Sequence, residues 1–321
     1  MSIFASNTLI HYAIMKDNNH AVFMNPYTDF GFKKLFGTEP NKDILISFLN
    51  ALFEGDRNSI VDLSYLNTEM LGPYYGDRNS VFDVYCHTAD GGHFIVEMQR
   101  SDQPYFKDRT VYYASSSIVQ QAPKRKRWSY RLSEVCVVGI LDFVFPNNEY
   151  GEESYVHRVR LKDTEDHHEV YKKLTFYYVE MPKFNKTEKE LVTMRDKWLY
   201  VLKNITYLME QPRELQEQVF TKFFEEARIG MFNEEERFAY MESQKHYRDN
   251  LNTLDYAYER GKDAGWEDGL AEGKKLGLAE GKELGLAEGL EQGRLAEREA
   301  LISRMKEVGV NPSIIDRITK P

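Results

Sequence analysis

Every segment with the pattern of a β-strand lies before Lys183, and this segregation limits the folds that the chain can adopt. The strand-like segments are rich in Val, Ile, Tyr and Phe and lie at 60–70, 80–87, 93–100, 134–145, 157–163 and 174–182. From Thr187 to the end, the spacing of apolar residues is helical. The sequence therefore predicts an α/β domain, with a mixed sheet flanked by helices, followed by an all-helical C-terminal region.

Three helices are expected in the α/β domain, two before the first of these strands and one between them. Thr28 is a good N-cap for a first helix, in which Phe32, Leu35 and Phe36 recur at helical spacing. A second helix is expected at 42–53, where Gly55 stops it, and a third at 105–121. A further short helix is expected at 311–318, close to the end of the chain.

The composition indicates a packed protein of a reducing compartment. Hydrophobic residues make up 42% of the 321 residues, and the only two cysteines, Cys86 and Cys136, lie in apolar runs. They are expected to be buried thiols, not a disulfide. No apolar run approaches the roughly 18 residues of a membrane helix, and the first residues lack the features of a signal peptide. We therefore expect a cytoplasmic protein with no membrane partner.

The predicted boundaries divide the chain into five parts. Residues 1–23 show little sign of order and are expected to be a poorly ordered extension. The α/β domain covers 24–182, a helical region covers 183–254, a glycine-repeat tail covers 255–298, and short helices cover 299–321.

The strands at 80–87 and 93–100 form a predicted hairpin whose register follows from parity. One face of each strand is wholly apolar, and these faces are formed by Phe82, Val84, Cys86, Phe94, Val96 and Met98. If the two apolar faces share one core, opposed residues have numbers that sum to an even value. A three-residue loop at 89–91 places Asp83 opposite Glu97, and a loop at 90–92 places it opposite Gln99. A two-residue Asp90–Gly91 turn would put the acids on opposite faces, so we predict an odd-length loop.

Two carboxylates on opposed strand positions point to a cation. Opposed Cβ atoms lie about 5 Å apart, and carboxylates that close repel each other unless a cation lies between them. Hard oxygen ligands at this separation suit Mg²⁺, which retains water and binds phosphate. Such an ion polarises a phosphodiester and lowers the pKa of the attacking water.

The ordered motifs of the chain resemble a known family. Asp83, followed on the next strand by Glu97 and Gln99, is similar to the PD-(D/E)XK nuclease motif with Gln in the Lys position. The series TDFGFKKLFG, SVFDVYC, FIVEMQ and YFKDRTVYYASS, with a Gly/Glu-rich tail after it, resembles the Rpn family of recombination-promoting nucleases, transposase-like members of the PD-(D/E)XK superfamily. These motifs cover about residues 24–145.

The resemblance implies a restriction-endonuclease-like fold and a role for each matched residue. Asp83 and Glu97 would bind Mg²⁺ or another divalent cation, Gln99 would orient the nucleophilic water, and Asp29 would complete the metal site from the first helix. Phe82 stands where the motif has Pro. Gln99 departs from the commoner Lys and cannot give positive charge to the transition state, which lowers the expected rate.

Several of these residues have alternative interpretations. Asp29 also fits as an acid that complements the dipole of the first helix. Arg109, on the helix after the hairpin, could contact DNA phosphate, orient the carboxylates or form a structural ion pair. The basic run Lys124, Arg125, Lys126 and Arg127, followed by Trp128, fits contact with a DNA backbone, or a solvated loop.

Glycine recurs at every fourth position from Gly261 to Gly293. Each glycine costs a helix roughly 1 kcal/mol relative to Ala, so nine of them do not favour a solitary helix. We expect residues 255–298 to form a long helix that associates with another copy through close backbone approach. A weakly helical, flexible tether is the alternative.

Two classes of function fit these observations. The first is a metal-dependent DNA endonuclease that hydrolyses phosphodiester bonds, with a role in recombination or mobile elements implied by the resemblance alone. The second is a catalytically weak or inactive nuclease-fold protein that binds DNA or another protein. The net charge of −9, Gln99 and the tail favour the second class, whereas the intact Asp83 and Glu97 favour the enzyme.

Overall fold

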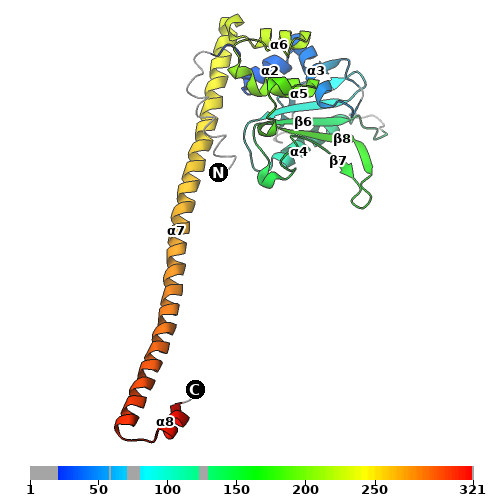
Figure 1. Cartoon of the computed structure of the whole chain (residues 1–321). Coiled ribbons are helices and arrows are strands. Elements are labelled where there is room, and N and C mark those ends of the chain that lie inside the picture. Colours follow the sequence, from blue (N-terminus) through cyan, green and yellow to red (C-terminus); the bar gives the residue numbers. More distant parts are fainter. Residues whose placement is uncertain (1–20, 58, 71–79, 123–128, 320–321) are drawn as a thin grey trace. The chain divides into compact units, whose positions relative to one another are not determined.

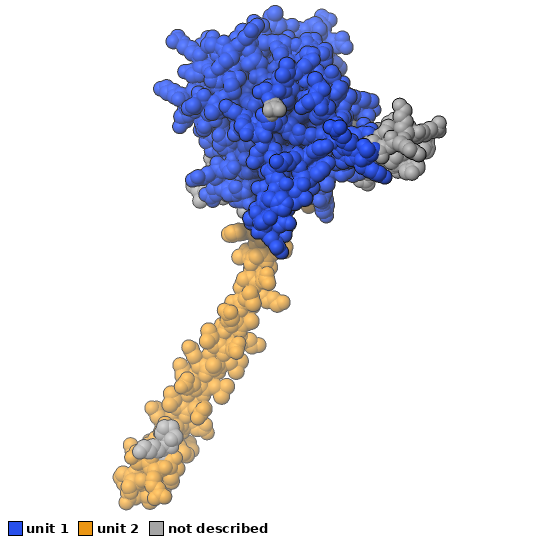
Figure 2. Space-filling model, turned by 90° about the vertical axis from the view of Figure 1, so that its right-hand side faces the viewer, with its two compact units in different colours: residues 1–248 blue, residues 249–321 orange. Residues whose placement is uncertain are grey.

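The computed structural model describes residues 21–57, 59–70, 80–122 and 129–319. The chain divides into two compact units, residues 1–248 and residues 249–321 (Figure 2). The first unit contains the sheet and the helices packed on it, and the described part of the second unit contains helices and no strand. The basic run at 124–127 and most of the predicted N-terminal extension lie outside the described residues.

A six-stranded mixed sheet organises the first unit (Figure 1). Its strand order is β1 (Leu63–Tyr65), β4 (Val84–Thr88), β5 (His93–Gln99), β6 (Val135–Leu141), β8 (Glu169–Glu180) and β7 (Val156–Lys162). The β5–β6 and β6–β8 pairs are parallel, and the other pairs are antiparallel. The short strands β2 (Glu69–Met70) and β3 (Ser80–Val81) pair with each other. The predicted mixed α/β sheet is confirmed.

Helices cover both faces of this sheet. On one side lie α2 (Asp29–Phe36), α3 (Lys42–Leu52), α5 (Met194–Asn204) and α6 (Gln218–Ala227), and on the other lies α4 (Phe106–Gln120) (Figure 1). Alternate residues of the central strands enter two separate apolar clusters, so that Cys136 and Val138 face the first set of helices while Val135 and Val137 face α4. All seven residues of β6 are buried, as expected of a parallel strand covered on both sides. Short 3₁₀ helices span Glu39–Asn41, Pro146–Asn148, Met181–Lys183, Glu188–Glu190, Ile205–Tyr207 and Ile229–Met231.

The hairpin of β4 and β5 has one of the predicted registers. Val84 pairs with Val96, and His87 pairs with His93, so opposed numbers sum to an even value. The connecting loop is 89–91: the Thr88 N–H donates to the Gly92 carbonyl, and the Gly91 N–H donates to the Thr88 carbonyl. Gly91 has φ +87°, the left-handed conformation that a three-residue hairpin loop requires. The two-residue turn is absent, and the prediction of an odd-length loop is confirmed.

Two predicted strands are shorter than the apolar pattern suggested. The segment 60–70 forms β1 and β2 separately, because the Asn67 side chain accepts a hydrogen bond from the Glu69 N–H at 3.0 Å and turns the chain. The segment 134–145 leaves the sheet after Leu141. There the Phe145 N–H donates to the buried Glu180 carboxylate at 2.6 Å instead of to a neighbouring strand.

The region after residue 183 contains no strand among the described residues, apart from a single bridge between Arg228 and Phe23. Phe23 is fully buried, at the end of the segment predicted to be poorly ordered. Helices α5 and α6 place Trp198 and Phe223 in the same apolar cluster as the sheet, so the helical region up to residue 248 belongs to the first unit. Cys86 and Cys136 are buried and unpaired, as predicted.

Helix α7 (Glu234–Glu307) runs through all nine glycines of the repeat, and α8 (Pro312–Thr319) follows it. The predicted helix at 255–298 is therefore present, within a longer one. Its side chains are exposed throughout the repeat, including Leu270, Leu276, Leu278, Leu284, Leu286 and Leu290. None of the described helices is long and apolar enough to cross a lipid bilayer.

Candidate active site

The two acids predicted to share a site lie beside each other at the end of the hairpin. Asp83 stands in a bend immediately before β4, and continuing the β4–β5 register places it opposite Glu97. The Asp83 N–H donates to Glu97 Oε1 at 3.2 Å, and Asp83 Oδ2 accepts from the Met98 N–H at 2.8 Å. Each carboxylate thus accepts a hydrogen bond from the main chain of the opposite segment, which fixes its position.

Burial makes this pair electrostatically unfavourable without a cation. Glu97 is only 6% exposed and Asp83 is half-buried. Burial raises the pKa of Glu97 well above its ordinary value, and the charge of Asp83 raises that pKa further. Burial also raises the pKa of Asp83, although the Met98 N–H opposes this shift. Neither carboxylate forms an ion pair with a described residue. Two adjacent carboxylates, one buried and one half-buried, without a counterion among the described residues are a donor set that fits a hard divalent cation.

Gln99 lies two residues further along β5 and is almost fully buried. Its amide oxygen accepts a hydrogen bond from Arg109 Nη2, and its amide nitrogen donates to the Ser101 carbonyl at 2.9 Å. Both ends of the amide are therefore engaged.

Arg109 lies on α4 and forms no ion pair with a described residue, so the structural ion pair considered from the sequence is not formed. Its guanidinium donates instead to Gln99 and to Gln103 Oε1, the latter at 2.8 Å. Its charge lowers the pKa of Glu97 from the side of α4, in part offsetting the effect of burial. Its Nε is buried without a hydrogen-bond partner.

Asp29 is the first residue of α2 and is exposed. It pairs with Lys33, one turn later, at 2.8 Å, and its charge raises the pKa of Asp83. The charge of Asp29 thus reaches the acid pair from the first helix. Asp29 is also an acid in the first turn of the helix, so the dipole interpretation fits the same position.

An open cleft of about 1030 Å³ lies over Asp83, within the first unit. Helix α2 contributes Asp29 and Lys33 to its lining, Arg100 follows directly after Gln99, and Ser243 and His246 come from the first turns of α7. Glu97 does not line the cleft and lies buried beside Asp83. A ligand in this cleft would meet carboxylates and cations together.

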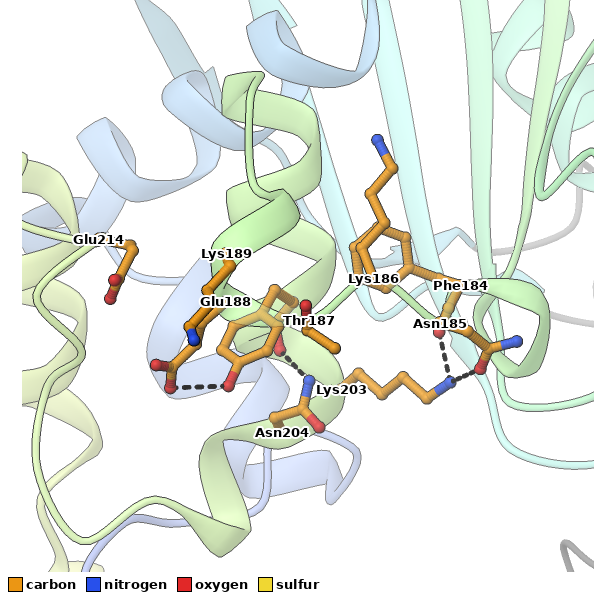
Figure 3. A pocket seen from close by; sticks show the side chains of 10 residues that line it. Phe184, Asn185, Lys186, Thr187, Glu188, Lys189, Lys203, Asn204 and Glu214 are labelled. Carbon is orange, nitrogen blue, oxygen red and sulfur yellow. Dashed lines mark hydrogen bonds between the residues drawn. The ribbon is translucent and has the colours of Figure 1, made fainter.

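A second hollow, of about 690 Å³, lies between α5 and the segment 184–189 (Figure 3). Its polar groups bind one another: Lys203 donates to the Phe184 carbonyl and to Asn185 Oδ1, and the Tyr200 hydroxyl donates to Glu188 at 3.0 Å. No predicted site residue lines it. We therefore place the chemistry in the cleft over Asp83.

Another group of possible ligands lies in the turn between β7 and β8, where Asp163, Asp166 and His168 come within 4.8 Å of one another. Asp166 and His168 are exposed, and hydrogen bonds within the turn already engage all three side chains. This group lacks the burial that distinguishes Asp83 and Glu97.

Three residues beside the acid pair were not singled out from the sequence. Lys33 and Arg100 line the cleft, and each lowers the pKa of Asp83. The spacing of Lys33 four residues after Asp29 was the available signal. Asp142 directly follows β6, its N–H donates to the Gln99 carbonyl, and burial raises its pKa to about 7. The available signal for Asp142 was its position directly after a strand that is parallel to β5.

Comparison with protein families matches residues 26–257 to a model described as PD-(D/E)XK nuclease family transposase. Searches of curated proteins and of solved structures returned no match. The family match covers the hairpin, the cleft and the helical region packed behind them.

Proposed function

This chain belongs to the PD-(D/E)XK nuclease family transposases, and on that premise we propose that it is a metal-dependent DNA endonuclease that hydrolyses phosphodiester bonds. The observation that carries the proposal is the buried Asp83–Glu97 pair without a protein counterion, beside an open cleft that contains cations. A role in recombination or in mobile elements would follow from the family alone.

Asp83 and Glu97 would hold the metal, and Asp29 would reach it from α2. Mg²⁺ fits this oxygen donor set, and another divalent cation of similar hardness would serve. When bound, the ion would polarise the phosphodiester and lower the pKa of the attacking water. The protein contributes the geometry, because main-chain N–H groups of β5 and of the Asp83 bend already fix both carboxylates.

Gln99 would orient the nucleophilic water next to these ligands. Its amide nitrogen now donates to the Ser101 carbonyl, so it must exchange that bond for one to the water. Arg109 would hold the other end of the amide in place during this exchange. We propose Arg109 as a positioning residue in this role, whereas the DNA contacts at Lys124, Arg125, Lys126 and Arg127 remain predictions.

The second candidate function is DNA or protein binding without cleavage. The engaged amide of Gln99 favours it, because a neutral side chain that is bound at both ends does little for a developing negative charge. The buried acid pair favours the enzyme, since a binding protein gains nothing from two adjacent buried carboxylates.

Nicking of supercoiled plasmid separates the two functions. The wild-type protein should nick in Mg²⁺ and not in EDTA. Asp83→Ala should lower the rate by about 10³-fold or more, because losing the metal removes several kcal/mol of transition-state stabilisation. Equal nicking by the wild type and by Asp83→Ala would assign the activity to a contaminant and sink the proposal.

We also propose that the glycine-repeat tail associates with a second copy of the chain. The exposed leucines and the open glycine positions of α7 support this, because small residues allow two helix backbones to approach closely. Light scattering should give the mass of an oligomer for the full chain and the mass of a monomer for a chain that ends at Asn250. If both are monomers at micromolar concentration, the tail is a tether and does not drive association.

A further inference from the structure

We propose that Lys33 provides the cationic contact to the scissile phosphate, the contribution that Gln99 cannot make from the Lys position of the motif. The inference rests on the proposed nuclease function and names a further catalytic residue for it. The starting observation is the lack of positive charge on β5 at position 99, where the side chain is neutral and both ends of its amide are occupied.

Arg109 is the cation nearest to Gln99, but it is not placed to contact a substrate in the cleft. It belongs to α4, does not line the cleft, and commits its guanidinium to Gln99 and Gln103. Its Nε is buried as well. A phosphate in the cleft would need a cation from another element.

Two lysines and one arginine line the described part of the cleft, namely Lys33, Lys34 and Arg100. Lys34 is only 18% exposed, because it pairs with Glu226 and Glu236 and packs over the Phe232 ring. Removing it from these two carboxylates would leave both uncompensated. Lys34 therefore has a structural role, because its ion pairs hold α2 against the neighbouring helices.

Arg100 and Lys33 differ in how they face the acid pair. Arg100 lies over the Tyr247 ring at 5.3 Å. Lys33 pairs with Asp29 at 2.8 Å and lines the cleft together with Asp83. Lys33 is thus the cleft cation that borders two of the three proposed metal ligands.

The Lys33 ammonium is also available. Its side chain is 47% exposed, and among the described residues it forms an ion pair with Asp29 alone, which is itself 57% exposed. An exposed ion pair of this kind contributes little and exchanges readily for another anion. A phosphodiester oxygen can therefore replace Asp29 as the partner of Lys33 at small cost.

Helix α2 holds the Lys33 backbone rigidly while its side chain remains free. The Thr28 side chain caps the helix by accepting from the Gly31 N–H at 3.0 Å, and Phe32, Leu35 and Phe36 are buried in the core. A flexible side chain on a fixed helix suits a group that must meet a phosphate at a defined place.

In the hydrolytic step, water forms a bond to phosphorus as the bond to the leaving sugar oxygen breaks. The water gives up a proton to solvent, and the leaving oxygen takes one up. Negative charge grows on the non-bridging oxygens, to which the Lys33 ammonium would donate a hydrogen bond. Lys33 transfers no proton and makes no covalent bond in this step.

The test compares Lys33→Ala, Lys33→Arg and the control Lys42→Ala in the full-length protein. Lys42 pairs with Asp62 at 2.8 Å, the same separation as Lys33 and Asp29, but does not line the cleft. We expect Lys33→Ala to lower plasmid nicking by ~10²–10³-fold, Lys33→Arg to recover part of the rate because it keeps the charge, and Lys42→Ala to match the wild type. A wild-type rate for Lys33→Ala overturns the inference.

A second readout separates a phosphate contact from support of the metal ligands. Calorimetric titration with Mg²⁺ alone should show that Lys33→Ala binds the ion as tightly as the wild type or more tightly, because a repelling charge has gone. Weakened Mg²⁺ binding, as expected for Asp83→Ala, would show that Lys33 supports the ligands and would overturn the phosphate role.

A failure of the proposed function would be recognised separately. If the wild type does not nick plasmid, the proposed cleavage is excluded. Binding of a short DNA duplex then tests the proposed contact between Lys33 and a phosphate. Lys33→Ala should then reduce the slope of log affinity against log salt by about one, as loss of one phosphate contact requires. An unchanged slope, equal to that of Lys42→Ala, would overturn the contact as well.

Discussion

Glycine serves opposite purposes in the two units of this protein. In the first unit, a Cβ on Gly31 would lie 2.3 Å from the Asn25 carbonyl oxygen, and one on Gly139 would lie 3.2 Å from the Phe106 ring. In the second unit, a Cβ on any of the nine repeat glycines would meet nothing within 4 Å. Packing inside the chain explains Gly31 and Gly139, whereas nothing inside the described chain explains the nine glycines of the repeat.

The same contrast applies to the other side chains. Around the acid pair each residue has one possible place, because register, burial and main-chain hydrogen bonds agree. Along the tail, glycine at every fourth position alternates with leucines and charged residues, all of them exposed. The residues of the first unit are therefore explained by packing in its own core. The tail instead presents a repeated exposed surface, whose role depends on the partner that it contacts.

The sharpest test of this contrast is Glu97→Gln, for which we expect the largest effect. It preserves the shape of a buried side chain and removes one carboxylate from the proposed metal site. Cleavage should fall by about 10³-fold or more, while the unfolding midpoint in EDTA should stay equal or rise, because a buried repulsion between acids has gone.

The control for this prediction is Glu283→Gln in the tail, which should leave cleavage unchanged. A Glu97→Gln protein that cleaves at the wild-type rate would mean that position 97 is specified by the fold alone.

Gly31→Ala should have the next largest effect, on stability. The new methyl group would collide with the Asn25 carbonyl and with the Thr28 hydroxyl at 2.7 Å, at the start of α2. Overpacking of this kind costs about 1–3 kcal/mol, and chemical denaturation should detect it. A wild-type midpoint would show that α2 can shift, and it would weaken the view that this helix holds Lys33 rigidly.

Much of the hairpin could be predicted from the sequence because its parity leaves few choices. Two strands with apolar alternate residues fix which numbers oppose each other, and Gly91 permits the odd-length loop that was observed. The broken strand at 60–70 could not be predicted from apolar content, because a single side-chain hydrogen bond from Asn67 ends it.

The side-chain partners around the acid pair were beyond sequence reasoning for a different reason. Gln99 was expected to orient a water, but which groups hold its amide depends on where α4 places Arg109, a contact between elements. A lysine four residues after an acid usually forms a solvated pair, so its spacing alone does not distinguish Lys33 from other surface lysines. Lys33 does form that pair, and only the three-dimensional cleft shows what else lies nearby.

The pH dependence of stability should be a smaller effect, and its sign follows from the raised pKa of Glu97. At a pH below the ordinary pKa of glutamate, Glu97 is protonated in both the folded and the unfolded state. As pH rises towards the folded pKa, the unfolded chain loses the proton first, so the metal-free protein loses stability. The loss is about 1.4 kcal/mol for each pH unit that separates the folded pKa from the unfolded one.

Denaturation of wild type and Glu97→Gln between acid and neutral pH in EDTA measures this loss as a growing difference between the two. Mg²⁺ should remove the difference at neutral pH by stabilising the wild type only. A difference that does not change with pH would show that Glu97 is not held protonated by its surroundings.

The smallest expected effect concerns the tail glycines, and its sign distinguishes the two explanations of the repeat. Replacing Gly277, Gly281 and Gly285 with Ala adds methyl groups into open space in a single chain, so the helix itself should gain up to about 1 kcal/mol per residue. If a second copy packs its backbone against these glycines, the same methyl groups hold the two helices apart and weaken association. Circular dichroism of the full chain should show equal or higher helix content, and light scattering should show whether the mass falls to that of a monomer. Higher helicity with unchanged or stronger association would contradict packing on the glycines and would assign association to the exposed leucines instead.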